Sequence, residues 1–228
     1  MLSKTFFKLF PQNCIFCGEV CRDFKTSPSC LNCFSSLENW GESCIKCGKK
    51  LPSSGICGEC LKSQVPFDFL FHLYSYEGKA RVLLNFYKFK GAWWMAEIFA
   101  LKIYKIIENL PENFKEAPLT FVPAHPYRIF TRNYHPVEYL ARTLSKNLQI
   151  NLIPALKKTH LKKPQTSLTK EEREKNVKGT FKVITKDIPE KIIILDDIYT
   201  TGSTLMECAK VLKKAGVKTI AGITLARA

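Results

Sequence analysis

The pattern of apolar and polar positions divides the chain into two unlike parts. Residues 12–62 are rich in turns and cysteines and show little periodic apolar patterning, whereas regular patterns begin after Pro66. A segment without such patterning builds little core of its own, so a bound metal would have to replace that core. We therefore predict a small module over residues 1–65 and a larger domain over residues 66–228.

The larger part alternates between strand and helix patterns. Apolar runs and alternation predict strands at residues 67–78, 119–124, 191–195 and 217–226. Helical spacing predicts helices at residues 92–110, 136–148 and 204–214, while residues 81–89 fit either a helix or a strand. The β-branched run at 191–195 is typical of a strand buried on both faces of a parallel sheet. The order favours an α/β fold built on right-handed βαβ units.

One long segment interrupts this order. Residues 157–182 hold nine Lys/Arg against three Asp/Glu and few apolar anchors. Loops of this length in compact domains are usually functional or disordered. We predict a long mobile loop over these residues.

Charge and hydropathy narrow the functional classes. The net charge is +15, of which +12 lies in residues 66–228. Such an excess attracts nucleic acid, acidic membranes or phosphorylated small molecules, although solubility alone would also explain it. No uncharged apolar run is long enough to span a bilayer, and Lys8 interrupts the N-terminal apolar stretch, which also lacks a small-residue cleavage site. We expect a cytoplasmic protein without a transmembrane segment.

The cysteines carry the most specific spacing in the chain. Nine of the ten lie in the first 60 residues, and eight of these form four C-x-x-C pairs. Two such turns can complete a tetrahedral four-thiolate zinc site with no position left for water. We predict two structural zinc ions on pairs taken in order, with cross-braced pairing and a redox dithiol as alternatives. We expect Cys21 to be a free thiol and Cys208 to lie in the core. The predicted ligands are Cys14, Cys17, Cys30, Cys33, Cys44, Cys47, Cys57 and Cys60.

A second motif covers residues 192–204. The buried strand delivers Asp196 and Asp197 at its carboxyl end, where open α/β sheets form their ligand crevice. Small hydroxylated residues and Gly202 then allow backbone N–H groups to surround a phosphate at the start of the next helix. Carboxylates accept hydrogen bonds from sugar hydroxyls, so the segment fits a ribose 5-phosphate.

Other interpretations of this motif fit less well. The chain contains neither G-x-x-x-x-G-K-[ST] nor G-x-G-x-x-G. A haloacid-dehalogenase phosphatase would need Asp-x-Asp near the start of its domain. An ordinary N-capped turn would not need two consecutive aspartates after four apolar residues.

Residues 196–204 resemble the phosphoribosyl pyrophosphate loop of type I phosphoribosyltransferases, and the whole chain is similar to the ComF family of competence-associated proteins. The likeness covers nearly all of residues 14–228. The chain departs from the family at residues 132–136, where Arg-Gly-Phe-Asn-Gln is usual, and at Lys158, where an arginine is common. Other residues throughout also carry the likeness, among them the C-x-x-C pairs, residues 66–68, 76–78, 88–91, 122–123, 125–126, 172–173 and 176–177, and Arg128, Gln165, Leu168, Gly179 and Phe181.

The resemblance implies a type I phosphoribosyltransferase-like domain that binds phosphoribosyl pyrophosphate with Mg²⁺ and acts in DNA uptake. It implies that Asp196 and Asp197 hold the ribose hydroxyls, that residues 124–128 hold the pyrophosphate, and that residues 157–182 close as a lid. Lys88 and Lys90 are either pyrophosphate or nucleic-acid contacts or a solvated pair. The implied ligand-binding residues are Asp196, Asp197, Thr200, Thr201, Gly202, Ser203, Thr204, Ala124, His125 and Arg128.

The resemblance also allows a function other than an enzyme. The chain would then bind single-stranded DNA and work with other competence proteins, while its phosphoribosyl site is regulatory or vestigial. No residue pattern indicates a nucleophile, so both the acceptor and the transferase activity stay open.

Overall fold

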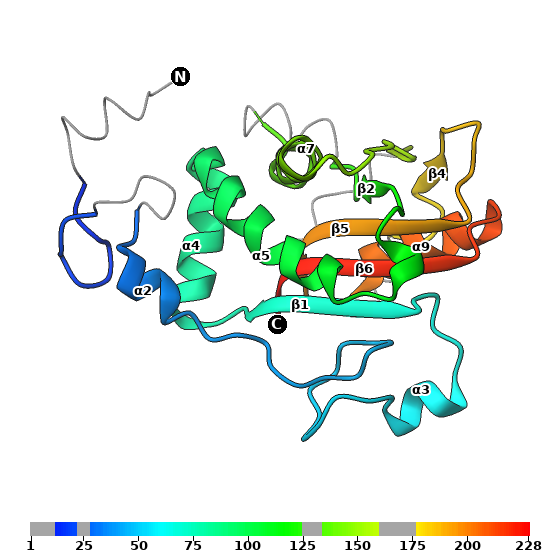
Figure 1. Ribbon diagram of the computed structural model, residues 1–228, viewed down its shortest axis with the longest axis horizontal. Helices are drawn as coiled ribbons and strands as arrows, with labels where there is room; N and C mark the ends of the chain where they lie inside the picture. Colours follow the sequence, from blue (N-terminus) through cyan, green and yellow to red (C-terminus); the bar gives the residue numbers. More distant parts are fainter. Residues whose placement is uncertain (1–11, 22–27, 125–133, 160–176) are drawn as a thin grey trace.

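The centre of the fold is a four-stranded parallel sheet. A computed structural model describes residues 12–21, 28–124, 134–159 and 177–228. In these residues the sheet has the order β1-β6-β5-β2, and each neighbouring pair is parallel (Figure 1). The strands are β1 (Phe69–Ser75), β2 (Leu119–Phe121), β5 (Lys191–Tyr199) and β6 (Thr219–Arg227). The predicted α/β class with a mostly parallel sheet is confirmed.

Strand β5 lies inside the sheet and is longer than the sequence analysis predicted. Its first apolar residues, from Ile192 to Leu195, have no exposed surface, as expected for a strand covered on both faces. The predicted end at residue 195 is wrong, because β5 continues through both aspartates to Tyr199. The ladder with β6 extends to the pair Tyr199 and Arg227, and a backbone ladder does not depend on side-chain polarity.

Helices cover both faces of the sheet and form two apolar clusters (Figure 1). One cluster packs Ile193 and Leu195 against the helices on one face, together with Phe34 of the Cys-rich part, and the other packs Ile192 and Ile194 against α9. The residues that fitted either a helix or a strand form α4. Among the described residues, no helix is both long enough and apolar enough to cross a bilayer. The helices are α4 (Gly78–Phe89), α5 (Ala96–Glu108), α7 (Pro136–Leu148) and α9 (Ser203–Lys214), with short 3-10 turns η1 (Trp93–Met95) and η2 (Glu112–Phe114).

The segment predicted to be one long loop has strands at both of its ends. Strands β3 (Leu156–Lys158) and β4 (Phe181–Val183) form an antiparallel pair. The prediction of a loop is therefore wrong for residues 157–158 and 181–182, while residues 160–176 lie outside the described residues. Leu156 and Phe181 are buried in the cluster that contains α9, and this burial outweighs the polar composition of the segment.

The Cys-rich part lies along the free edge of β1 (Figure 1). Its helices are α2 (Leu31–Ser35) and α3 (Gly58–Lys62). The N–H of Leu70 donates to the carbonyl of Ile45 at 2.7 Å, and the N–H of Trp40 donates to the carbonyl of Leu73 at 3.0 Å. These bonds satisfy backbone groups that an exposed edge strand would leave open. The boundary at residue 65 stays a prediction.

Candidate metal centres and a candidate anion site

The eight paired cysteines gather into two groups of four. In each group, the four Sγ atoms all lie within 4.8 Å of one another. The first two C-x-x-C turns form one group and the last two form the other, so the structure has the sequential pairing and not the cross-braced one. We call them the first group (Cys14, Cys17, Cys30, Cys33) and the second group (Cys44, Cys47, Cys57, Cys60).

The distances between sulfur atoms fit a tetrahedral metal ion. The Sγ atoms of Cys17 and Cys30 are 3.6 Å apart, and those of Cys47 and Cys57 are 3.7 Å apart. A Zn–S bond of about 2.3 Å places tetrahedral sulfurs about 3.8 Å apart, whereas a disulfide needs about 2 Å. Four cysteine sulfurs without an open position suit a structural zinc ion, which would stabilise the fold and perform no chemistry.

Backbone N–H groups favour the thiolate form of the first cysteine in each group. Phe16 N–H donates to Cys14 Sγ at 3.5 Å, and Cys57 N–H donates to Cys44 Sγ at 3.3 Å. Burial raises the pKa of the Cys14 and Cys44 thiols, but hydrogen bonds of this kind outweigh it and lower each pKa to about 6. Burial and the neighbouring cysteines raise the pKa of the last cysteine in each group, so a metal ion, which needs deprotonated sulfur, would have to displace the remaining protons.

The two remaining cysteines lie outside these groups. Cys21 is buried beside the first group, and burial raises the pKa of its thiol to about 11. Cys208 is fully buried in the cluster that contains α9. Both agree with the predicted free thiol and core residue.

The two aspartates lie at the carboxyl end of β5. The Oδ1 atom of Asp196 accepts a hydrogen bond from Asp197 N–H at 2.8 Å, and Oδ1 of Asp197 accepts one from Ile198 N–H at 2.6 Å. Because side chains alternate along a strand, Asp197 lies on the face covered by α4 and Asp196 on the face covered by α9. Lys88, in the last turn of α4, pairs with Asp197 at 2.8 Å between Nζ and Oδ2.

The environment of Asp196 disfavours its ionised form. Burial, followed by the negative charge of Asp197, raises the pKa of the Asp196 carboxyl to about 8. The N–H of Asp197 and the ammonium groups of Lys88 and Lys158 lower that pKa but do not cancel the rise. A ligand that brings hydrogen-bond donors or a cation would favour the ionised carboxylate.

The turn after β5 prepares a helix N-terminus. Gly202 has a φ of +75°, and a Cβ atom there would lie 2.1 Å from the Tyr199 ring. Helix α9 begins at Ser203; its N-cap residue, Gly202, has no side chain to cap it, and the Ser203 N–H makes a long hydrogen bond of 3.4 Å to Thr201 Oγ1. The hydroxyl oxygens of Thr201 and Ser203 are 2.7 Å apart. The first N–H groups of α9, including that of Thr204, therefore join two hydroxyls in an arrangement that suits a phosphate.

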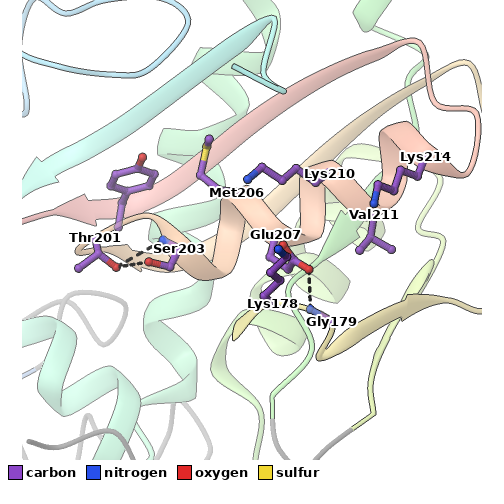
Figure 2. Close-up of a pocket in the computed structure, with 10 residues that line it drawn as sticks. Lys178, Gly179, Thr201, Ser203, Met206, Glu207, Lys210, Val211 and Lys214 are labelled. Atoms are coloured by element: carbon purple, nitrogen blue, oxygen red, sulfur yellow. Dashed lines mark hydrogen bonds between the residues drawn. The ribbon is translucent and has the colours of Figure 1, made fainter. Parts of the chain in front are cut away.

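A groove of about 700 Å³ runs from this turn along the outer side of α9, and Figure 2 shows the side chains that line it. Glu207 accepts a hydrogen bond from Gly179 N–H at 2.7 Å, which closes one wall. Asp196 and Asp197 are not among the lining residues, but Tyr199, Thr201 and Ser203 are, so the groove begins at the candidate phosphate site and leads away from the two aspartates. The sequence analysis missed the groove as a whole, because its residues come from the end of β5, from the turn, from α9 and from the segment before β4. They are Lys178, Gly179, Tyr199, Thr201, Ser203, Met206, Glu207, Lys210, Val211 and Lys214.

The predicted pyrophosphate loop is described only in part. His125 and Arg128 lie outside the described residues. The N–H of Ala124 donates to Nε2 of His135 at 2.7 Å, and Nδ1 of His135 lies 3.3 Å from the N–H of Glu138. A neutral imidazole accepts through only one nitrogen, so the shorter contact is the stronger hydrogen bond. His135, a departure from the family pattern, thus links the segment after β2 to α7.

The sequence analysis also missed a cluster between the Cys-rich part and the sheet. Arg227 of β6 and Tyr199 of β5 are paired in the sheet, and the guanidinium lies over the Tyr199 ring. Tyr199 also contacts the ring of His72 on β1, and Arg227 contacts the ring of Trp40. No local motif predicts these contacts, because they join residues far apart in the chain; Arg227, for example, bonds to Cys47, which is 180 positions away.

Comparisons with known proteins agree with this arrangement. The double zinc ribbon domain family matches residues 7–61. Competence protein F of Haemophilus influenzae is 28% identical over 93% of this chain and 90% of its own length. Competence protein ComFC of Streptococcus pneumoniae is 26% identical over 94% of this chain and 99% of its own length. The DNA utilization protein YhgH of Escherichia coli is 25% identical over 78% of this chain and 80% of its own length. The predicted resemblance to the ComF family is confirmed.

Proposed function

Because this chain is homologous along nearly its whole length to competence proteins F and ComFC, we propose that it acts in DNA uptake and binds phosphoribosyl pyrophosphate at the end of β5. The names of the relatives, two competence proteins and a DNA utilization protein, support the first part. The likeness of residues 196–204 to a phosphoribosyl pyrophosphate loop supports the second. A cytoplasmic location and contacts with other competence proteins belong to the same proposal.

One observation carries the ligand proposal. Two carboxylates lie near the carboxyl end of an inner parallel strand, and a helix N-terminus follows the tight turn at Gly202. The crevice at the carboxyl end of a parallel sheet is where open α/β folds bind their ligands. Sugar hydroxyls need acceptors and a phosphate needs donors, and this short segment presents both.

Each group has a definite role in this proposal. A ribose across the end of β5 would meet Asp197 on the α4 side and Asp196 on the α9 side. Thr200, Thr201, Ser203 and the first N–H groups of α9 would surround the 5-phosphate. Lys88, which now pairs with Asp197, would turn to the pyrophosphate when the ribose hydroxyls take its place. Mg²⁺ carried with the ligand would balance the remaining negative charge.

The proposal concerns binding, and pentosyl transfer is a further step. Transfer would use positioning and charge stabilisation at the anomeric carbon and would need water to be excluded. The predicted contributions of His125 and Arg128 stay predictions, as does the lid role of residues 157–182.

Calorimetric titration with phosphoribosyl pyrophosphate and Mg²⁺ tests the ligand proposal. We expect the wild type to bind and the double variant Asp196→Asn/Asp197→Asn to lose roughly 2 to 5 kcal/mol of binding free energy, because the ribose loses two charged acceptors. Asp187→Asn, at an exposed site far from this strand end, is the matched control and should bind as the wild type does. Absence of wild-type binding at millimolar ligand would overturn the proposal.

A second candidate function, single-stranded DNA binding, is favoured by the groove along α9. Lys178, Lys210 and Lys214 line it, and its one acidic residue, Glu207, is hydrogen-bonded to the backbone. Lysines spaced along a groove can follow a sugar-phosphate backbone without reading its sequence. Such a strand would lie beside the phosphoribosyl site and would not need Asp196 or Asp197.

Replacement of the three groove lysines by alanine tests this candidate. Affinity for single-stranded DNA should fall, and the slope of log affinity against log salt should become shallower by about 2, since each lost phosphate contact contributes about 0.7. Replacing Lys102, Lys105 and Lys146, which lie on α5 and α7, removes the same charge elsewhere and is the control. Equal losses in both triple variants would show that net charge, and not this groove, determines binding.

A further inference from the structure

A chain of contacts joins the second group to the turn before α9. Arg227, the last residue of β6, donates from Nη1 to the carbonyl oxygen of Cys47 at 2.6 Å. Its guanidinium carbon lies 4.8 Å from the centre of the Tyr199 ring and 5.3 Å from that of the Trp40 ring. Cations over aromatic rings are attracted to them, more strongly where water is excluded. Arg227 is therefore held by the backbone of a metal-ligand residue and in turn holds Tyr199.

Tyr199 passes this constraint to the turn. Its ring fills the space beside Gly202, where a Cβ atom would lie 2.1 Å from the ring. The carbonyl of Tyr199 also accepts a hydrogen bond from Ala228 N–H at 3.0 Å, which ties the last residue of β5 to the chain end. The ring therefore packs directly against the turn that precedes α9.

The opposite side of Arg227 is fixed as well. Thr224 Oγ1 donates to the carbonyl of Ala226 at 3.1 Å, so at 2.7 Å it accepts from Nδ1 of His72. The other nitrogen of His72, Nε2, then accepts from Arg227 Nη1 at 3.4 Å. Gly48 packs directly on this ring, since a Cβ atom there would lie 2.1 Å from Nε2. The backbone of the Cys44–Cys47 turn, the first C-x-x-C turn of the second group, therefore packs on the sheet.

We propose that Arg227 is a positioning residue that couples metal binding at the second group to the phosphate-binding turn through Tyr199 and Gly202. The inference rests on the proposed function for its ligand, the 5-phosphate of a phosphoribosyl compound. A metal ion at the second group fixes the carbonyl of Cys47, which fixes Arg227 and the Tyr199 ring. Because this chain of contacts begins at Cys47 of the second group, we expect metal binding at the first group to leave the turn unchanged.

The coupling acts through preorganisation. A helix N-terminus binds an anion well when its N–H groups already converge, because ordering them at the moment of binding costs free energy. A turn released from Tyr199 loses that advantage although no ligand-contacting residue has changed. By reciprocity, the phosphate ligand should strengthen metal binding at the second group by the same factor.

Amide hydrogen exchange in the full chain tests the coupling without any ligand. Cys60→Ser removes a ligand of the second group, and Cys17→Ser removes one of the first. Both should lower the zinc content from two ions to one, but only Cys60→Ser should speed exchange in residues 200–206. Arg227→Met should do so while keeping both zinc ions, and Arg142→Met, at an arginine paired with Glu138 on α7, should not. Unchanged exchange in Arg227→Met, or equal effects of the two cysteine variants, would overturn the inference.

Calorimetry adds a second readout. Affinity for phosphoribosyl pyrophosphate should fall about tenfold in Arg227→Met and Cys60→Ser and stay within twofold in Cys17→Ser, as expected for a coupling of ordinary size. If the wild type does not bind this ligand, the proposed function fails, and the exchange experiment still decides the coupling. Normal affinity in Arg227→Met alongside faster exchange would contradict the preorganisation step.

Discussion

The sheet and the Cys-rich part hold their shapes by different means. In the sheet, residues 192–195 of β5 are fully buried between two apolar clusters. In the Cys-rich part, the two local clusters consist mainly of the cysteines themselves. A core of side chains tolerates the loss of one member at a limited cost, whereas a four-ligand site works as a unit. The same number of deleted atoms should therefore have unlike consequences in the two regions.

The largest effect is expected from a metal ligand. Cys14→Ser should reduce the zinc content from two ions to one and unfold the segment around the first group, because that segment depends on a metal contribution on the order of 10 kcal/mol. Metal analysis and exchange of residues 12–33 measure both effects. Cys21→Ser, a buried cysteine outside the groups, should keep two ions. Equal zinc content in Cys14→Ser and the wild type would contradict the idea that the Cys-rich part depends on each metal ligand.

A core residue of the sheet should cost less and leave both metal sites loaded. Ile193→Ala deletes a fully buried side chain and should lower the free energy of unfolding by about 2 to 5 kcal/mol. Ile184, half exposed, provides the control, and its replacement by alanine should change stability by less than about 0.5 kcal/mol. Denaturant unfolding measures both. Similar losses in the two variants would mean that this part of the sheet is not tightly packed.

Two glycines with nearly the same positive φ sharpen the comparison further. Gly18, beside the first group, has a φ of +76° and open space around it, while Gly202 has a φ of +75° and contacts the Tyr199 ring. Gly18→Ala should cost only the backbone strain, about 1 kcal/mol. Gly202→Ala adds a collision with the ring and should cost about 2 to 3 kcal/mol. Thermal unfolding compares them, and equal costs would show that the ring does not constrain the turn.

The smallest effect concerns pH. The pKa of Asp196 is raised to about 8 in the folded protein, so the folded state binds more protons than the unfolded state above the ordinary Asp pKa of about 3.9. The stability that the protonated Asp196 contributes is therefore lost as the pH rises from about 4 to about 8. Relative to the wild type, the free energy of unfolding of Asp196→Asn should increase by about 1 kcal/mol between pH 6 and pH 7. Above pH 8 this difference should stop increasing. A flat difference, as expected for Asp187→Asn, would show that Asp196 is ionised throughout.

Local features were predictable from the sequence because their causes are local. The C-x-x-C spacing indicates paired thiolates, and the β-branched run before Asp196 indicates a doubly covered strand. The predicted helix at residues 136–148 matches α7, where Pro136 opens the first turn. In each of these cases, neighbouring residues determine the conformation.

The remaining features depend on residues far apart in the chain. No local pattern predicts that Lys88 pairs with Asp197 or that Arg227 donates a hydrogen bond to Cys47. Strands β3 and β4 are short and rich in lysine, so only their packing on α9 reveals them. Sequence patterns therefore indicated the cysteines that gather in the two groups. The ligand roles of residues 196–204 stay predictions, and the contacts that tie these regions together were not predicted.

Backbone NMR titration with phosphoribosyl pyrophosphate and Mg²⁺ tests most directly the central claim that the end of β5 and the start of α9 form one ligand site. The amide signals of residues 196–204 and of Lys88 should shift together and saturate at one affinity. Those of residues 207–214, along the groove, should change little. Shifts confined to the groove residues, with the signals of Asp196, Asp197 and Gly202 unchanged, would contradict the claim.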